Sequence, residues 1–268
     1  MSKTIGIIGC GWLGFPLAED LLKSGYRVKG TTTSTSKLKT LKLAGIDSYK
    51  AELNEDKIEG DIESFLSELH ILIVNIPPRL RENKKSSYSA KIKLLLTEIE
   101  KTTIKNIVFV SSTSVYGNLE GNVTEDSIPK PETDSGKQLL QCEQLLLQNK
   151  TFSTAVIRFG GLIGEDRHPI TKLSGKKGLK NGEALVNLIH ASDCIHMIKT
   201  IVEKEYWNTI FNGVYPQHPT KREYYTNEAL KRGLALPEFT VSSTKTFKKI
   251  IISKNFLNKS NFLYTPII

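Results

Sequence analysis

The segment Gly9-Cys10-Gly11-Trp12-Leu13-Gly14 fits the pattern G-x-G-x-x-G and indicates the fold class of the chain. It follows a short apolar run, Ile5 to Ile8, and opens a stretch, Leu13 to Ser24, in which leucines recur at helical spacing. A strand, a glycine turn and a helix in this order begin a βαβ unit. Glycines in such a turn let the backbone approach a pyrophosphate, and the helix N-terminus offers free N–H groups to it. We therefore expect a dinucleotide to bind here; the alternative is a glycine turn required only for packing.

The same alternation of strand-like and helix-like segments continues along the chain. Strands are predicted at residues 5–8, 26–31, 47–53, 70–75, 107–110 and 154–158, and helices at residues 13–24, 36–43, 88–101 and 139–148. This alternation predicts an α/β fold, a Rossmann-type doubly wound parallel sheet with helices on both faces.

Beyond Gly160 the pattern loosens, which indicates a smaller C-terminal lobe. We expect a strand at 186–189, a helix at 192–203 and a strand at 210–212 to return to the main sheet. The predicted NAD(P)-binding domain therefore comprises residues 1–160 plus 186–213. The smaller lobe, on the substrate side, comprises residues 161–185 plus 214–268.

Composition excludes several classes of protein. The 268 residues include 37 Lys and Arg and 28 Asp and Glu, a net charge of +9, and 39% are hydrophobic, which suits a globular core. No apolar run approaches the roughly 20 residues of a membrane span, and no signal peptide is visible. The three cysteines lack disulfide or metal-ligand spacing, and the lysines are dispersed rather than clustered. We expect a cytoplasmic protein with no metal, no membrane and no nucleic-acid partner.

The end of the second predicted strand bears on the choice of cofactor. NAD enzymes usually place a carboxylate about 20 residues beyond the glycines, where it holds the ribose 2′-OH. The segment 30–37 contains no acid; its candidate donors to a 2′-phosphate are Thr32, Thr33, Ser34 and Lys37. The hydroxyls could equally form a turn and cap a helix. We expect NADP, with NAD as the alternative.

Residues 109–117, Phe-Val-Ser-Ser-Thr-Ser-Val-Tyr-Gly, resemble a signature of the extended short-chain dehydrogenases/reductases, the branch of nucleotide-sugar epimerases and dehydratases. The glycine loop and residues 51–53, 157–164 and 187–193 also match, so the resemblance extends to about residue 215. It implies an NAD(P) cofactor, a small-molecule substrate such as a nucleotide-sugar or another polar metabolite, and a homodimer. It also implies further cofactor contacts at Glu52, Leu53, Ile76, Pro77, Ser111, Phe159 and Gly160.

The catalytic residues that the resemblance implies are only partly present. Ser112 matches the Ser or Thr that polarises the substrate oxygen. The partner motif Tyr-x-x-x-Lys is missing, because Ser135 stands in the place of Tyr and Leu139 in the place of Lys. A serine hydroxyl is a much weaker acid than a phenol, and no cation accompanies it to lower its pKa. The chain is therefore most similar to the atypical members of the superfamily, which keep the cofactor fold and mostly lack assigned activities.

Two hypotheses follow from this comparison. The first is an NAD(P)-binding oxidoreductase or isomerase of the epimerase/dehydratase type, in which a non-standard acid or base acts beside Ser112. Tyr116 and Lys137 are the candidates for that role. The second is a catalytically silent NADP-binding sensor or regulator. Among the other polar residues, we expect His190 with Asp193 to be a structural pair and Arg167-His168 to be exposed on a turn.

Overall fold

The structure is a computed structural model that describes residues 3–78, 80, 86–240, 248–259 and 262–264. An eight-stranded sheet forms its main body, with the strand order β11-β8-β6-β5-β1-β2-β3-β4. All neighbouring strands run parallel except the β3–β4 pair. The strands are β1 (Thr4–Ile8), β2 (Arg27–Thr32), β3 (Asp47–Leu53), β4 (Ile58–Gly60), β5 (Ile71–Val74), β6 (Asn106–Ser112), β8 (Ser153–Phe159) and β11 (Thr209–Gly213).

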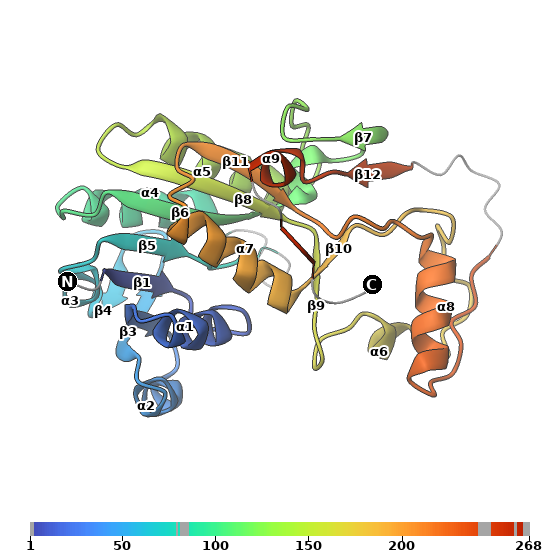
Figure 1. The fold of residues 1–268 in the computed structure, drawn as a ribbon, viewed down its shortest axis with the longest axis horizontal. Coiled ribbons are helices and arrows are strands. Elements are labelled where there is room, and N and C mark those ends of the chain that lie inside the picture. The colour runs from blue at the N-terminus through green and yellow to red at the C-terminus, as the bar shows by residue number, and fades with distance from the viewer. Residues whose placement is uncertain (1–2, 79, 81–85, 241–247, 260–261, 265–268) are drawn as a thin grey trace.

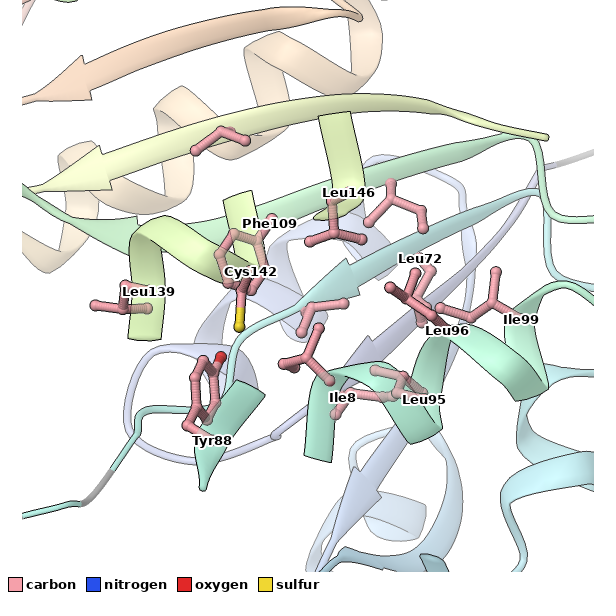
Figure 2. Packing of buried hydrophobic residues seen from close by; sticks show 14 of the residues in the cluster. Ile8, Leu72, Tyr88, Leu95, Leu96, Ile99, Phe109, Leu139, Cys142 and Leu146 are labelled. Carbon is pink, nitrogen blue, oxygen red and sulfur yellow. The ribbon is translucent and has the colours of Figure 1, made fainter. Parts of the chain in front are cut away.

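Helices cover both faces of this sheet (Figure 1). One face packs against α1 (Gly14–Lys23), α2 (Thr35–Leu43), α7 (Ala191–Glu203) and α9 (Lys254–Lys259). The other packs against α3 (Ile62–Leu66), α4 (Tyr88–Ile99) and α5 (Asp134–Gln148). Figure 2 shows residues of this second core, where α4 and α5 face each other over Ile8, Leu72 and Phe109 of the sheet. The predicted doubly wound parallel sheet is confirmed.

The order of the strands locates the ligand crevice. From β1 the chain first extends the sheet through β2 and β3, and it then resumes on the other side of β1 with β5, β6, β8 and β11. The direction therefore reverses between β1 and β5. In open sheets of this kind the carboxyl ends of the strands at the reversal form the crevice that binds ligands. The glycine loop follows β1 at that point.

A smaller region lies beside the sheet (Figure 1). Its elements are β9 (Gly161–Ile163), β10 (Leu188–His190), α6 (Ile170–Leu173) and α8 (Lys221–Lys231), and its core includes Ile170 and Tyr225. A short 3-10 helix, η1 (Thr113–Tyr116), follows β6. A separate parallel pair, β7 (Gly121–Val123) and β12 (Lys249–Ile251), joins two segments that are distant in sequence. The domain boundaries given above remain a prediction, and α9 packs against the main sheet through Phe256.

Three local predictions differ from the structure. The strand expected at 186–189 to return to the main sheet is β10, which pairs with β9 instead. Both edges of β8 are already occupied by β6 and β11, so the main sheet offers no place beside it. Helix α5 begins at Asp134 rather than Leu139, because the Thr133 hydroxyl caps it by accepting from the Gly136 N–H at 3.1 Å. The elements β4 and α3 were not anticipated.

No helix among the described residues is long and apolar enough to span a bilayer. Within the same residues, no group of three or more His, Cys, Asp or Glu side chains is placed to hold a metal ion.

Candidate cofactor and active site

The glycines of the loop after β1 have different structural roles. Gly9 adopts φ +98°, a left-handed conformation that side chains other than glycine disfavour. At Gly14 a Cβ atom would lie 2.2 Å from the Gly9 carbonyl oxygen, so helix α1 can approach β1 only with glycine there. At Gly11 a Cβ atom would meet no atom within 4 Å. Packing therefore explains Gly9 and Gly14, whereas the space beside Gly11 is open.

The backbone N–H groups of the same loop differ in whether a described residue accepts from them. Thr31 accepts from the loop on one side, through its hydroxyl from the Gly9 N–H at 3.1 Å and through its carbonyl from the Cys10 N–H at 2.9 Å. No described residue accepts a hydrogen bond from the N–H groups of Gly11, Trp12 or Leu13, and no side chain caps α1. Free N–H groups at the N-terminus of a ten-residue helix form a site suited to an anion.

Cys10 lies in this loop but contributes no thiol chemistry. Its side chain is buried against Gly30, where a Cβ atom would lie 2.5 Å from the Cys10 sulfur. Burial raises the pKa of the Cys10 thiol to about 12, so it stays protonated at neutral pH. Because the thiol faces the interior, only the backbone of Cys10 is left for the cofactor contact predicted there.

The predicted 2′-phosphate residues divide into two kinds. Thr32 is buried, and its hydroxyl accepts from the Ser34 N–H at 3.1 Å, so it forms the turn at the end of β2. Ser34 precedes α2, and its hydroxyl lies 2.8 Å from that of Ser36 instead of capping the helix. Thr33 and Lys37 are exposed beside them. Hydroxyl and ammonium donors therefore surround the start of α2, and residues 30–37 contain no carboxylate to oppose an anion.

The other residues predicted to touch the cofactor occupy strand ends and adjacent loops. Glu52 is exposed and Leu53 buried on β3, and Ile76 and Pro77 follow β5. Phe159 is buried at the end of β8. Gly160 follows it, and a Cβ atom on Gly160 would lie 2.5 Å from the Asn187 carbonyl oxygen. These positions are compatible with the predicted contacts, which remain a prediction.

Ser112 lies at the end of β6, half-buried. Its hydroxyl oxygen accepts from the Ser114 N–H at 3.2 Å. This bond uses a lone pair and leaves the Ser112 proton free for another acceptor. The next turn packs on the start of α5, where a Cβ atom on Gly136 would lie 2.8 Å from the Ser114 carbonyl oxygen. The half-buried Ser135 is the neighbour of Gly136, so the family's substrate-polarising position and the vacated Tyr position lie on adjoining turns.

Leu139, in the place of the family's Lys, is 4% exposed and packs in the core beside Tyr88 and Cys142 (Figure 2). Lys137 is exposed on the first turn of α5. Leu139 therefore supplies no cation to Ser135, and no hydrogen bond joins Lys137 to Ser135 in the part of the chain that the structure describes.

Tyr116, one of the two candidates for the catalytic acid or base, lies in the interior. Tyr116 is completely buried, its hydroxyl donates to the Asn212 side-chain oxygen at 2.9 Å, and the Arg158 guanidinium donates to it at 2.8 Å. Burial raises the pKa of Tyr116 despite the neighbouring Arg158. Tyr116 is therefore a member of an interior network in this structure, and its catalytic role stays a prediction.

The centre of that network is a buried ion pair that the sequence analysis missed. Glu143 of α5 accepts from Arg158 through both carboxylate oxygens, with the shortest contact, to Nη2, at 2.6 Å. The Ser111 hydroxyl donates to Glu143 at 2.5 Å, so Ser111 points inward and only its backbone remains for a cofactor. The signal in the sequence was a charged residue on the apolar face that Leu139, Cys142 and Leu146 define.

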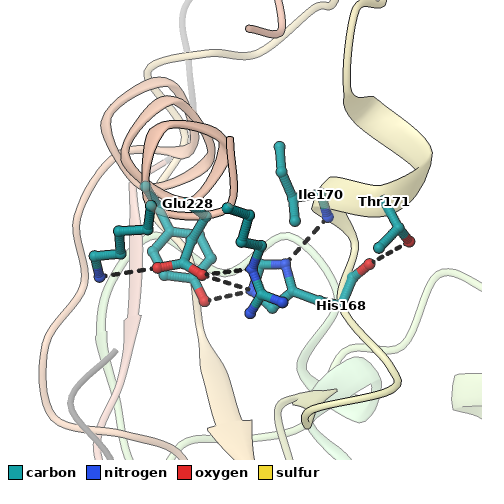
Figure 3. Close-up of polar contacts among 7 residues, drawn as sticks. His168, Ile170, Thr171 and Glu228 are labelled. Atoms are coloured by element: carbon teal, nitrogen blue, oxygen red, sulfur yellow. Dashed lines mark hydrogen bonds and ion pairs between the residues drawn. The ribbon is translucent and has the colours of Figure 1, made fainter. Parts of the chain in front are cut away.

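His168 is also not where it was expected. It is buried, with its Nε2 atom 2.8 Å from the Tyr224 hydroxyl and 3.7 Å from a Glu228 carboxylate oxygen, while its Nδ1 accepts from the Ile170 N–H (Figure 3). Burial lowers the pKa of His168, so the neutral ring joins α6 to α8. The expectation of an exposed turn holds for Arg167 alone.

His190 precedes α7 and caps it. Its Nδ1 atom accepts from the Ser192 N–H at 3.2 Å. His190 thus has a structural role at this strand-to-helix junction, but its bond is to Ser192; the expected pair with the fully buried Asp193 stays a prediction.

The sheet is doubly wound, a glycine loop lies where its strand order reverses, and a Ser-rich turn follows β6. These features define a nucleotide-binding protein of the short-chain dehydrogenase/reductase type. Residues 5–212 match the model of the NAD dependent epimerase/dehydratase family, and the chain belongs to that family.

Similar proteins cover almost the whole chain. Protein YeeZ of Escherichia coli (strain K12) is 32% identical over 263 residues, which are 98% of this chain and 96% of that protein. Among solved structures, the UDP-Glc/GlcNAc 4-epimerase of Campylobacter jejuni has a TM-score of 0.82 at 15% identity, over 100% of this chain and 95% of that chain. MoeE5 in complex with UDP-glucuronic acid and NAD has a TM-score of 0.79 at 17% identity, over 98% and 94%. These two structures share the fold.

Proposed function

We propose that the chain binds a dinucleotide at the loop after β1, with NADP preferred over NAD. The observation that carries the proposal is the set of N–H groups at Gly11, Trp12 and Leu13 that donate to no described residue, together with the open space beside Gly11 at the reversal of the strand order. The preference for NADP rests on the exposed hydroxyls and Lys37 at the start of α2 and on the missing carboxylate. NAD is the alternative, which the NAD bound in the structure of MoeE5 supports.

Binding of NADPH and NADH, compared by calorimetry, tests this proposal. We expect the tighter complex with NADPH, and we expect Lys37→Ala to narrow the difference between the two. Lys39→Ala is the matched control, because Lys39 is exposed on the same helix, further from its start. A tenfold preference for NADH, about 1.4 kcal/mol, would show that the start of α2 does not receive a phosphate.

The proposed reaction is hydride transfer to or from a small polar substrate, of which a nucleotide-sugar is the leading example. The bound dinucleotide would supply the hydride chemistry. Ser112 would donate its free proton to a substrate oxygen, because its own lone pair is engaged by the Ser114 N–H. The group that donates or accepts the other proton would be non-standard, because Ser135 stands in the place of the family's Tyr; its candidates are Tyr116, which is buried, and Lys137, which is exposed. Support comes from family membership and from the UDP-glucuronic acid held by MoeE5.

The second candidate function is a catalytically silent NADP-binding sensor or regulator. Two observations favour it: the Tyr116 hydroxyl is buried and bonded to Asn212 and Arg158, and the apolar Leu139 supplies no cation where the family has Lys. Turnover of UDP-sugars by the wild type and by Ser112→Ala separates the two candidates. Turnover at ordinary rates of about 1 to 10³ s⁻¹ that falls in the variant supports the enzyme. Cofactor binding without turnover supports the sensor.

We further propose a homodimer in the cytoplasm that has neither a nucleic-acid nor a membrane partner. The support is the family resemblance for the dimer and the dispersed lysines for the absence of nucleic acid. Light scattering after size-exclusion chromatography tests the dimer, and a monomer at micromolar concentration would contradict it.

A further inference from the structure

A two-residue turn after β9 reaches the cofactor loop. The Gly164 N–H donates to the Arg167 carbonyl at 2.8 Å, and the Arg167 N–H donates back to Gly164 at 3.3 Å, so Glu165 and Asp166 form the tip. The side chains of Glu165, Asp166 and Arg167 are exposed. We call residues 164–167 the clasp.

The clasp holds one side chain, the indole of Trp12. The Trp12 Nε1–H donates to an Asp166 carboxylate oxygen at 2.8 Å. The Arg167 guanidinium carbon lies 4.8 Å from the centre of the Trp12 ring, within the range of a cation–π contact. A Cβ atom on Gly164 would lie 2.7 Å from Cζ2 of the indole, so only glycine leaves room for the ring at this approach. Three positions of one turn thus enclose a residue that is more than 150 positions earlier in the sequence.

Trp12 is also one of the residues whose backbone N–H is free to meet a phosphate. An indole fixed on three sides restricts the backbone of residue 12, and a donor ordered before binding avoids an entropic cost on binding. The contact is exposed, so its effect on the stability of the fold should be small. We therefore expect the contact between Trp12 and the clasp to affect ligand binding more than stability.

We propose that Asp166 is a positioning residue for the pyrophosphate of the dinucleotide and acts through Trp12. This inference rests on the proposed binding of a dinucleotide at the loop after β1. Arg167 and Gly164 form the other walls of the slot. The clasp thereby links the substrate-side segment after β9 to the cofactor loop.

The test is the calorimetric affinity of the full chain for NADPH, or for NADH if that binds more tightly. Ordering one large side chain corresponds to about a 3- to 10-fold change in affinity. We expect that loss in Asp166→Ala and in Trp12→Phe, with no further loss in the double variant, since both remove the same bond. Asp166→Asn should bind like the wild type, because its amide oxygen still accepts from the indole. Glu165→Ala, on the same turn, is the matched control and should also bind like the wild type.

A second probe separates positioning from general damage. Adenosine 2′-monophosphate, or adenosine if NADH is preferred, lacks the pyrophosphate, so every variant should bind it with the affinity of the wild type. Any one of three results would overturn the inference. These are a wild-type dinucleotide affinity in Asp166→Ala, a loss of affinity in Asp166→Asn as large as in Asp166→Ala, and an equal loss of affinity for the second probe. A wild type that binds neither dinucleotide would refute the proposed function as well, whereas the other results would leave that function standing.

Discussion

The replacement Gly11→Val separates the fold of the cofactor loop from its binding function. A Cβ atom on Gly11 meets nothing within 4 Å, and the residue is exposed. The free energy of unfolding should therefore change by no more than about 0.5 kcal/mol. The valine side chain would instead occupy the open space beside Gly11, where we propose that the pyrophosphate accepts from the Trp12 and Leu13 N–H groups.

The size of the binding loss follows from those two donors. A hydrogen bond to a charged group is worth about 1.5–3 kcal/mol, so two lost bonds to a pyrophosphate amount to about 3–6 kcal/mol. This corresponds to a 10²- to 10⁴-fold weaker affinity. Calorimetry with NADPH and NADH measures the affinity, and denaturant unfolding measures the stability of the same sample.

Gly14→Ala is the contrasting control. Its Cβ atom would lie 2.2 Å from the Gly9 carbonyl oxygen, so the backbone must shift, at a cost of about 1–3 kcal/mol of stability. Gly11→Val should thus lose binding and keep its stability, whereas Gly14→Ala should lose stability. Wild-type affinity in Gly11→Val would refute our assignment of the open space to a pyrophosphate.

Three other predictions concern the interior. Glu143→Ala leaves the buried Arg158 guanidinium unpaired and should lower the free energy of unfolding by about 3–5 kcal/mol; a loss below 1 kcal/mol would contradict a tightly paired interior. Burial raises the pKa of Glu125 above its ordinary 4.5, so the native state binds this proton more readily than the unfolded chain does. The stability that protonated Glu125 contributes is complete below the pKa of the unfolded chain and is lost as pH rises through the higher pKa of the folded protein. Glutamine does not titrate, so Glu125→Gln should flatten this decline of the unfolding free energy above about pH 4.5. The double replacement Ser135→Tyr with Leu139→Lys restores the family's pair, but it should not give rapid turnover of UDP-sugars, because a lysine at 139 must enter the core. In denaturant unfolding, Leu139→Lys alone should lower the free energy of unfolding by at least about 2 kcal/mol.

The sheet could be predicted from the sequence because its signals are local. A short apolar run such as Ile71–Val74 identifies a buried strand, and the spacing of apolar residues identifies a helix. The glycine loop is recognised in the same way, from a few consecutive residues. The pairing of short strands carries no such local signal. A strand was correctly expected around residues 188–190, but nothing in the sequence of these residues indicates that they pair with β9 rather than with the main sheet.

The side chains of the candidate site were harder to predict. The position of Ser112 at a strand end follows from the motif around it, and the strand does end there. The burial of Tyr116 depends on Arg158 and Asn212, which are 42 and 96 positions away in the sequence. His168 is likewise buried by a helix 56 positions further on. Contacts over such separations arise only when the sheet and lobe have assembled, so residue type and spacing do not reveal them.

The parallel pair β7–β12 has a consequence for the order in which the chain is built. Glu125, just after β7, accepts from the N–H groups of Lys254 and Asn255, and β12 can pair with β7 only once residues 249–251 have been made. During synthesis the strands from β1 to β8 emerge first and can assemble while the ribosome is still at work. Of the N–H groups that donate to Glu125, that of Asn212 is synthesised 87 residues later and that of Asn255 130 residues later. Pairing of β7 with β12 therefore comes after the strands from β1 to β8 have been synthesised.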